Sequence, residues 1–464
     1  MGTGNAFHAV TKYVERGSRE LTILYLLGNM PIRYLIVGPL FACVLLLTLL
    51  RPKFGIIAFL GLLFIPPQFF FWGFIEWRMP FVVAMVLLIS SVLNPPRRYF
   101  PVFSGTQRIW WTLLLASLIN SVLWSADFDR SYAILVDTWL KTFTFAFLLI
   151  LWTEDEKDVR RVLWTVVICF SLLAMRGLYQ YSKGYEEIGG IGFTTMADRN
   201  DFAMHLAMVV PIAFFLVRTS DNRWVKFGLA CSVVILFACI VATYSRMGFL
   251  LIGLSFSYLW FVSKRKILYL IVAGTIALVA VAVMPGKYFD RMATIFNDKE
   301  QDASITGRLD GWRYGWKMVE DHPITGVGLD TFETPKVYYH YADSGDSHPH
   351  VAHNAYIQIA AEAGIAAFIG WFMWILVSVK QLGSVVRGSV NEKLRACALA
   401  LKLSISFYLV GAIFLSAEDR ELLFVVLGLC IVVNSLYKRE AEENVPQKYR
   451  LQGLAPSSAR EPAV

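Results

Sequence analysis

The stretch that decides the fold is Phe227–Tyr244, which reads FGLACSVVILFACIVATY and contains no charged residue. As a helix it would be about 27 Å long, close to the ~30 Å hydrocarbon core of a bilayer. Comparable runs occupy Ile267–Met284 and Tyr132–Leu151, the latter interrupted only by Asp137 and Lys141. Runs of this length are typical of transmembrane helices, so the sequence predicts an all-α integral membrane protein.

Composition extends this prediction to the whole chain. Of the 464 residues, 56% are hydrophobic and 17% are charged, whereas in soluble domains about a quarter of all residues are charged. A net charge of +8 would suggest a nucleic-acid partner in a soluble protein. Here the basic residues lie in short turns between apolar runs, where membrane orientation explains them, and no nucleic-acid partner is expected.

The apolar runs predict about twelve or thirteen spans, at 34–50, 54–72, 80–93, 109–124, 132–152, 162–179, 202–217, 226–243, 247–262, 267–284, 356–378, 396–415 and 421–436. One set of alternating turns is basic: 51–53, 97–98, 157–161, 218–226, 264–266, 380–395 and 438–439. The other set is acidic, mixed or nearly neutral. By the positive-inside rule, the basic turns and the C-terminal tail are cytoplasmic, and the other turns face outward.

The N-terminal stretch leaves its own topology open. A single span at 34–50 would place the N-terminus outside, despite Lys12, Arg16, Arg19 and Arg33. Two short or re-entrant segments within 20–50, or an interfacial helix before the first span, are the alternatives.

These features divide the chain into five segments. We expect N-terminal transmembrane helices at 1–160, a core of transmembrane helices at 161–284, one large outer loop at 285–355, C-terminal transmembrane helices at 356–437, and a disordered cytoplasmic tail at 438–464. The loop is long enough to suggest a function of its own.

The large loop has the charge of an outer segment and signals of local helices. Between Lys287 and Asp346 it carries eleven acidic and seven basic residues, a net charge near −4. Apolar residues recur there at helical spacing after a possible N-cap at Ser304: Ile305, Leu309, Trp312, Trp316 and Val319. This stripe predicts a helix that lies in the membrane interface or, alternatively, packs on the rest of the loop. His322-Pro323 should end the helix.

Four cations lie in apolar spans or at their outer ends: Lys141, Arg176, Arg199 and Arg246. Charge at membrane depth costs free energy, which makes each a candidate for binding an anion. Arginine suits phosphate because its planar guanidinium donates parallel hydrogen bonds. The alternatives are snorkelling to the headgroups, or ion pairs with Asp198, Asp201 or Asp137.

Histidines gather before the span at 356–378, in the run Ser347-His348-Pro349-His350-Val351-Ala352-His353-Asn354. A neutral His353 at the outer interface could accept a proton from a hydroxyl, and Asn354 is a plausible N-cap that would fix its position. Two alternatives stay open: the HxHxxH spacing could bind zinc, or His353 could be a capping or packing residue. We expect no metal and no cofactor.

Glu362, in Glu362-Ala363-Gly364, follows nine residues after His353 within the next predicted span. A carboxylate inside a span is a functional candidate. It can equally be a structural partner for a cation or a backbone group.

Taken together, these motifs resemble the O-antigen ligase and polymerase superfamily of bacterial membrane glycosyltransferases. The resemblance is carried by Ala352–Tyr356 through Glu362–Gly364, by Tyr244–Gly248, and by Gly307–Trp312 followed by His322-Pro323 and Gly326–Gly328. It covers residues 160–380. The N-terminal part, with Arg51–Lys53, Pro66–Gln68 and Trp72-Gly73, resembles the branch of putative O-glycosylation ligases associated with exosortase systems.

The resemblance implies a GT-C-like helical architecture and a site facing the periplasm across the bacterial inner membrane. It implies that a glycan moves en bloc from an undecaprenyl-pyrophosphate donor to a hydroxyl of lipid A-core or of a protein, without metal and with inversion. His353 would then be the base, and Arg246 and Arg199 would hold the pyrophosphate. Arg176, Lys141 and Arg308 would be secondary partners of the same anion, and Glu362 and Asn354 would support the site.

Three other functions remain open at this point. A polymerase of the same superfamily would share the donor half of the site, and its acceptor would be another lipid-linked glycan. A transporter of lipid-linked glycans would also present cations to an anionic headgroup, although transporters more often show two related halves. A membrane scaffold with a sensory loop would leave the outer cations unexplained.

Overall fold

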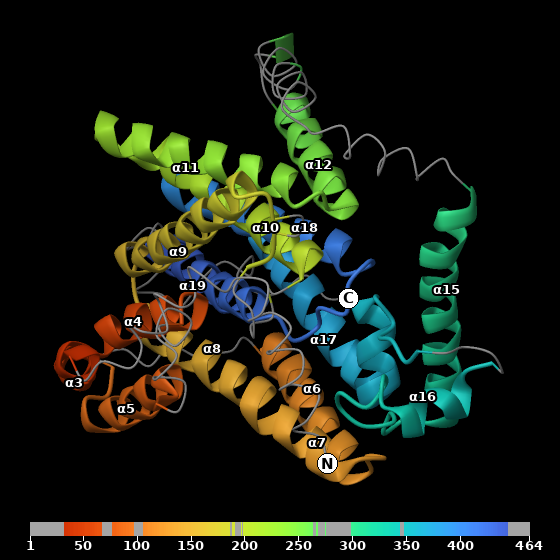
Figure 1. The fold of residues 1–464 in the computed structure, drawn as a ribbon. Helices are drawn as coiled ribbons and strands as arrows, with labels where there is room; N and C mark the ends of the chain where they lie inside the picture. Colours follow the sequence, from red (N-terminus) through yellow and green to blue (C-terminus); the bar gives the residue numbers. More distant parts are fainter. Residues whose placement is uncertain are drawn as a thin grey trace. The chain divides into compact units, whose positions relative to one another are not determined.

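The computed structural model describes residues 32–66, 77–96, 105–185, 188–190, 196, 198–262, 266–267, 274, 298–343 and 348–443 (Figure 1). The alternatives for residues 1–31, nearly all of the span predicted at 267–284, and the tail after Glu443 lie outside these residues. Within the described part the chain is helical, without a strand. The predicted all-α membrane fold is confirmed.

The chain separates into two compact units, Met1–Arg97 and Arg98–Val464. In the first unit, α3 (Ile32–Leu50), α4 (Pro52–Phe64) and α5 (Met79–Leu93) pack against one another. The Ser90 hydroxyl donates to the carbonyl of Leu49 at 2.7 Å, which ties α5 to the end of α3.

The second unit contains the remaining helices. They are α6 (Gly105–Leu123), α7 (Phe128–Ile134), the π-helix η3 (Leu135–Leu140), α8 (Lys141–Trp152), α9 (Glu156–Ser182), α10 (Arg199–Thr219), α11 (Arg223–Ala242), α12 (Arg246–Val262), α15 (Asp298–Asp321), α16 (Pro335–Tyr341), α17 (Ala355–Gly388), α18 (Glu392–Gly411) and α19 (Glu421–Glu443). Because α19 continues to Glu443, residues 438–443, predicted as the start of an irregular tail, are helical.

Seven helical segments of the described residues are long and apolar enough to cross a membrane: Phe128–Trp152, Glu156–Ser182, Arg199–Thr219, Arg223–Ala242, Ala355–Gly388, Glu392–Gly411 and Glu421–Glu443. Shorter apolar helices occupy Ile36–Leu50, Pro52–Phe64, Met79–Leu93 and Arg246–Ser255. Each predicted span in the described part of the chain coincides with a helix. The protein is therefore a multi-pass membrane protein.

Short polar side chains begin most of the long helices. The side chains of Asp155, Asp198, Asn222, Asn354 and Asn391 accept hydrogen bonds from backbone N–H groups of the first turns of α9, α10, α11, α17 and α18. These N–H groups have no partner inside the helix, so an Asp or Asn cap satisfies them at the membrane boundary. The predicted N-cap at Asn354 is confirmed.

Helix α10 forms the centre of the second unit. It contacts α9, α11, α12 and α18 (Figure 1), and 78% of its apolar window is buried within the protein, against 28% for α11. A second centre is α17, which packs closely on α6. A Cβ at Gly370 would lie 2.8 Å from the backbone nitrogen of Leu114, so only glycine permits this approach.

The outer loop contains one long helix rather than only short ones. Because α15 begins at Asp298, Ser304 lies inside it, and the predicted N-cap at Ser304 is wrong. The predicted stop is confirmed, since the helix ends at Asp321, before His322-Pro323. Its buried face is formed by Gly311, Tyr314, Gly315, Met318 and Val319.

The predicted apolar stripe of α15 is divided by the fold. Val319 is buried, whereas Leu309 and Trp316 are 53% and 57% exposed. The alternative in which the whole stripe packs on the loop is therefore wrong for these two residues. Glycines allow the backbone of α15 to approach its neighbours closely, so the buried face shifts away from the tryptophan.

Candidate functional site

The second half of the outer loop is docked on a kink in α17. Gly364 has φ 83° inside this helix, and the freed N–H of Ile365 donates to the carbonyl of Pro323 at 2.8 Å. Gly326 has φ 66°, and a Cβ there would overlap the carbonyl of Glu362. The Gly-Val-Gly turn and the Glu-Ala-Gly turn are thus two halves of one contact.

Glu362 is the residue on which this contact converges. Its carboxylate accepts hydrogen bonds from the backbone N–H of Asp330 at 2.9 Å, from that of Phe332 at 3.3 Å, and from Nε2 of Gln358 at 2.8 Å. Its carbonyl accepts from the hydroxyl of Ser121 at 2.6 Å. These partners correspond to the structural alternative for Glu362, in which the carboxylate holds backbone groups.

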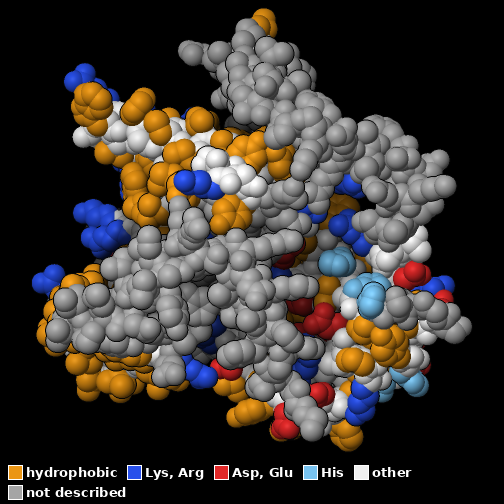
Figure 2. Space-filling view, in the orientation of Figure 1, with side chains coloured by type: hydrophobic (Ala, Val, Ile, Leu, Met, Phe, Trp, Pro, Cys, Tyr) orange, Lys and Arg blue, Asp and Glu red, His pale blue; other side chains and the backbone are white. Residues whose placement is uncertain are grey.

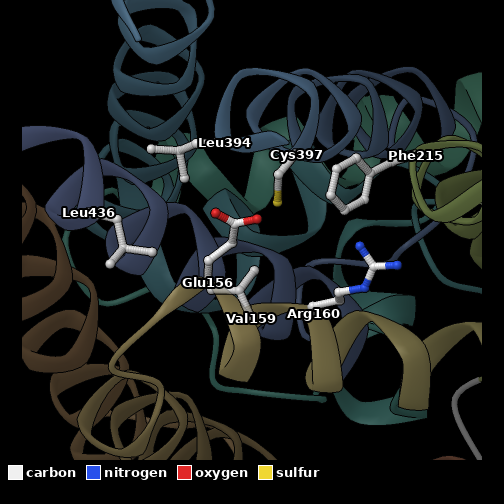
Figure 3. A pocket seen from close by; sticks show the side chains of 7 residues that line it. All are labelled: Glu156, Val159, Arg160, Phe215, Leu394, Cys397 and Leu436. Atoms are coloured by element: carbon white, nitrogen blue, oxygen red, sulfur yellow. The ribbon is translucent and has the colours of Figure 1, made fainter. Parts of the chain in front are cut away.

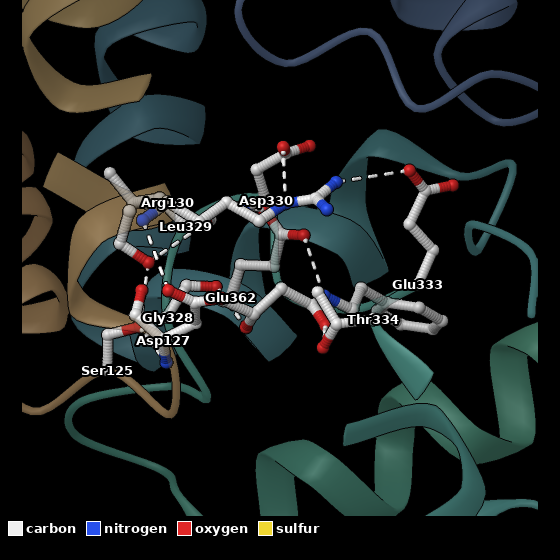
Figure 4. Close-up of polar contacts among 12 residues, drawn as sticks. Ser125, Asp127, Arg130, Gly328, Leu329, Asp330, Glu333, Thr334 and Glu362 are labelled. Carbon is white, nitrogen blue, oxygen red and sulfur yellow. Dashed lines mark hydrogen bonds and ion pairs between the residues drawn. The ribbon is translucent and has the colours of Figure 1, made fainter. Parts of the chain in front are cut away.

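A second anchor ties the loop to the start of α7 (Figure 4). The Arg130 guanidinium contacts Asp330 at 2.8 Å and Glu333 at 3.3 Å. The hydroxyl of Ser131 donates to the carbonyl of Leu329 at 2.8 Å. The loop is therefore held from two sides, by α17 and by α7.

The two arginines of the predicted anion site each begin a helix. Arg199 is the first residue of α10, behind the N-cap Asp198, and Arg246 is the first residue of α12. The Ser245 hydroxyl accepts from the N–H of Gly248 at 3.1 Å and donates to Oδ1 of Asn200 at 2.8 Å. This bond holds the two helix starts together. Helix N-termini carry partial positive charge, so the pair favours an anion.

A buried ion pair also holds the first turn of α10, through Asp201. Nε of Arg420, in the turn before α19, contacts Oδ1 of Asp201 at 2.9 Å, with both side chains less than 15% exposed. Arg420 also contacts Asp419 at 2.7 Å. Asp201, one of the carboxylates considered as a partner for the predicted cations, is thus engaged by an arginine that the sequence analysis did not single out.

His353 lies where the loop enters α17, next to Arg308 of α15. Burial lowers the pKa of His353, and the charges of Arg308 and His350 lower it further, whereas Asp198 acts in the opposite direction. Burial also lowers the pKa of Arg308, and the positive charge of Arg246 adds to this effect. Arg308 is therefore close enough to interact electrostatically with both Arg246 and His353, and these surroundings favour the neutral form of the imidazole.

Backbone strain coincides with these motifs. Among the described residues, four non-glycine residues have positive φ, and three of them are Tyr244 (53°), Asp330 (57°) and His353 (48°). Such conformations cost about 1–3 kcal/mol each and persist where the surroundings enforce them, often at functional sites. Here they precede Arg246, follow the Gly-Val-Gly turn, and hold the predicted base.

The remaining predicted cations differ in their placement. Nη1 of Arg176 donates to the carbonyl of Gly190 at 2.9 Å, and the N–H of Gly190 donates to the carbonyl of Met196 at 2.7 Å. Arg176 thus supports the chain that leads to Asp198. Lys141 begins α8, which packs on α19, and no contact among the described residues joins it to the other cations.

The histidine run does not gather as a set of metal ligands. Both ring nitrogens of His350 have protein partners, with Nδ1 2.7 Å from the hydroxyl of Tyr338 and Nε2 2.8 Å from the carbonyl of Gly307. In the part of the chain that is described, no three His, Cys, Asp or Glu side chains come together in a way that could hold a metal.

Figure 2 shows His side chains beside Lys or Arg side chains on one face of the protein, with Asp or Glu side chains close to them. A small pocket lies elsewhere, lined by Glu156, Val159, Arg160, Phe215, Leu394, Cys397 and Leu436 (Figure 3). Glu156 and Arg176 are at opposite ends of α9, about 30 Å apart at 1.5 Å per residue. This pocket is therefore separate from the candidate site.

Several residues of the site were missed by sequence reasoning. Asn200, Gln358 and Arg420 act through contacts with distant segments, and nothing in their local pattern indicates those partners. His350 was considered only as a possible zinc ligand, and its contacts with Gly307 and Tyr338 were not predicted. The one usable signal was position, because Asn200 and Arg420 lie at outer ends of predicted spans.

Comparison with known proteins matches part of the chain. Residues 231–372 match the protein-family model described as O-Antigen ligase. This range contains Arg246, Arg308, His353 and Glu362, and it ends before α18. No curated protein matches the chain. This part of the chain is therefore similar to O-antigen ligases, which supports the resemblance to the O-antigen ligase and polymerase superfamily of membrane enzymes.

Proposed function

We propose that the protein is a glycosyltransferase that moves a glycan en bloc from an undecaprenyl-pyrophosphate donor to a hydroxyl acceptor. The acceptor would be a lipid A-core sugar or a Ser or Thr of a protein, at the periplasmic face of the bacterial inner membrane. The observation that supports this most is that Arg308 lies within electrostatic range of both Arg246 and His353, whose neutral form its surroundings favour.

The cationic half of the site suits a pyrophosphate. Arg199 and Arg246 begin two helices that a hydrogen bond between Asn200 and Ser245 holds together, and Arg308 lies close to Arg246. Like charges repel, so bringing them together costs free energy that a bound anion would recover. Guanidinium groups also suit phosphate oxygens geometrically.

The reaction follows from these groups. His353 accepts the proton of the acceptor hydroxyl, and the hydroxyl oxygen forms a bond to the anomeric carbon of the donor sugar. The bond from that carbon to the pyrophosphate oxygen breaks, and the lipid pyrophosphate leaves with the electron pair. The arginines stabilise the charge that develops on it, so the step needs no metal, and attack opposite the leaving group inverts the anomeric carbon.

A lipid-linked donor also fits the surface that leads to the site. Ile168, Leu172, Met175 and Tyr179 form an exposed stripe at helical spacing on α9, and it ends beside Arg176. In a membrane protein such a stripe faces lipid tails. A polyprenyl chain could lie along it while its pyrophosphate reaches the arginines.

The test is glycan transfer by the purified protein from a lipid-pyrophosphate-linked oligosaccharide, with EDTA present. We compare wild type with His353→Ala and Arg246→Ala. Removing a general base should lower kcat by roughly 10²–10⁴-fold. The control is His348→Ala, an exposed histidine of the same run, which should transfer at the wild-type rate.

Each outcome separates the alternatives. Transfer that both substitutions abolish supports a metal-independent transferase built on these residues. A single added glycan per acceptor indicates a ligase, and a ladder of products indicates a polymerase. Undiminished transfer by His353→Ala removes His353 as the base. Absence of transfer to any acceptor, with movement of the lipid-linked glycan across vesicles, supports a transporter instead.

A further inference from the structure

His350 joins three segments of the outer loop through one imidazole ring. Its Nε2 lies 2.8 Å from the carbonyl of Gly307 on α15, and its Nδ1 lies 2.7 Å from the hydroxyl of Tyr338 on α16. A carbonyl can only accept, so Nε2 carries the hydrogen and donates to Gly307. Nδ1 also lies 3.2 Å from the carbonyl of His348, so the ring is held by the Tyr338 hydroxyl and by two carbonyls.

The bridge lies directly beside the predicted base and one of its cations. Gly307 is the residue before Arg308, and His350 is three residues before His353. The same two segments meet at Gly311, where a Cβ would lie 3.3 Å from both the Cα of Ala352 and the carbonyl oxygen of Val351. The backbone of α15 is therefore packed directly on the chain that carries His353.

His353 is restrained from its other side as well. The N–H of Ala352 donates to Oε1 of Gln358 at 3.0 Å, and Oδ1 of Asn354 caps α17. Between these restraints His353 adopts φ 48°, a conformation that a histidine leaves unless its neighbours enforce it. The nearby positive charge of Arg308 also acts on the His353 ring, so the neighbouring contacts must hold the ring in place against it.

We propose that His350 is a positioning residue, which bridges Gly307 and Tyr338 so that His353 and Arg308 stay in register across the site. This role rests on the proposed glycan transfer, because it concerns the placement of the base. His350 itself does not touch the substrate. Misplacing a catalytic group by about 1 Å can lower the rate ~100-fold without changing what the rest of the site binds.

The experiment measures kcat and KM for the lipid-pyrophosphate donor with His350→Ala, His350→Gln and Tyr338→Phe. We expect His350→Ala to lower kcat by about 100-fold with KM for the donor within threefold of wild type. His350→Gln should recover most of the loss, because its amide still donates to Gly307. Tyr338→Phe removes one hydroxyl from a fully buried ring and should lower kcat only several-fold.

His348→Ala is the matched control, since its side chain is exposed and its activity should equal that of wild type. A kcat for both His350→Ala and Tyr338→Phe equal to that of wild type would overturn the positioning role and leave the proposed transfer intact. If His350→Ala does not fold, as seen by size-exclusion chromatography, His350→Gln and Tyr338→Phe decide the question. Absence of transfer by wild type itself would remove the proposed function, and this role with it.

Discussion

The two ends of the helix bundle in the second unit use the same residue types differently. At the end carrying the basic turns, Arg161 contacts Asp158 at 2.7 Å and Arg160 donates to the carbonyl of Thr219 at 3.2 Å. There the Glu440 carboxylate accepts from the Ser389 hydroxyl at 2.6 Å and from the N–H of Asn391 at 2.7 Å. At the other end, Arg246 and Arg308 are brought close to each other.

This difference distinguishes structural charges from functional ones. A charge that meets an opposite charge or a backbone group stabilises the fold where it stands. Two cations brought close together beside strained backbone, as Arg246 and Arg308 are near Tyr244 and His353, lower the stability of the fold, and such an arrangement is common at functional sites. Structural and functional charges can be distinguished by four pairs of substitutions, in which one residue belongs to the candidate site or contacts it and a matched residue lies elsewhere.

The largest effect should come from the buried ion pair of the outer end. Arg420→Ala leaves Asp201 and Asp419 without their cation, and removing one partner of a buried pair costs about 3–5 kcal/mol. Arg161→Ala breaks a pair whose arginine is 62% exposed, which should cost less than about 1 kcal/mol. Thermal unfolding in detergent measures both. Equal shifts of the midpoint would contradict the contrast.

The next effect concerns two arginines that each begin a helix. Arg246 begins α12 and Arg223 begins α11, behind the N-cap Asn222 at the opposite end of the bundle. Arg246→Ala should lower kcat for glycan transfer by roughly 10²–10³-fold, because charge stabilisation of the leaving group is lost. Arg223→Ala should not alter kcat. A similar loss in both variants would show that the effect is on helix stability.

Two glycines with positive φ separate backbone strain from close packing. Gly184 has φ 82° and open space where a Cβ would lie, whereas a Cβ at Gly326 would overlap Glu362. Gly184→Ala should cost about 1–2 kcal/mol for the left-handed backbone. Gly326→Ala should cost about 1–3 kcal/mol more from overpacking. Midpoints of thermal unfolding compare the two, and equal losses would refute the docking of the loop on α17.

The smallest effect is on pH dependence. The Arg308 charge favours the neutral imidazole of His353 and so lowers its pKa. Arg308→Ala should raise that pKa, so the acid limb of kcat/KM should move to higher pH. Arg313→Ala, on the same helix but paired with Asp310 and Asp343, should leave the limb in place. A limb that moves in neither variant would remove Arg308 from the surroundings of His353.

Local patterns gave correct predictions for helices and their ends. Apolar runs located the helices, His322-Pro323 ended α15, and Asn354 capped α17, because each depends on residues within one or two turns. The N-cap predicted at Ser304 failed, since helical propensity extends α15 back to Asp298. A serine caps a helix only where its own backbone is not helical, and Ser304 lies inside α15.

The candidate site was predicted as a list of residues but not as an arrangement. Arg246, Arg199, His353 and Arg308 stood out by charge, position and family resemblance. Their connections run through Asn200 and Ser245, 45 residues apart, and through Asp201 and Arg420, 219 residues apart. Hydrogen bonds at such separations leave no periodic signal, so sequence reasoning could not find them. For the same reason, the sequence did not decide whether Glu362 has a functional or a structural role.

By itself, the sequence determined that this chain crosses a membrane many times and carries one large polar loop, because burial of apolar runs in lipid depends only on composition and length. It also determined where most helices begin and end, since capping is local. Only the tertiary structure decided which charges meet. Helix α18 packs on both α10 and α17, α12 packs on α10, and α15 packs on α17. Charge interactions depend on distance in space rather than on separation along the chain.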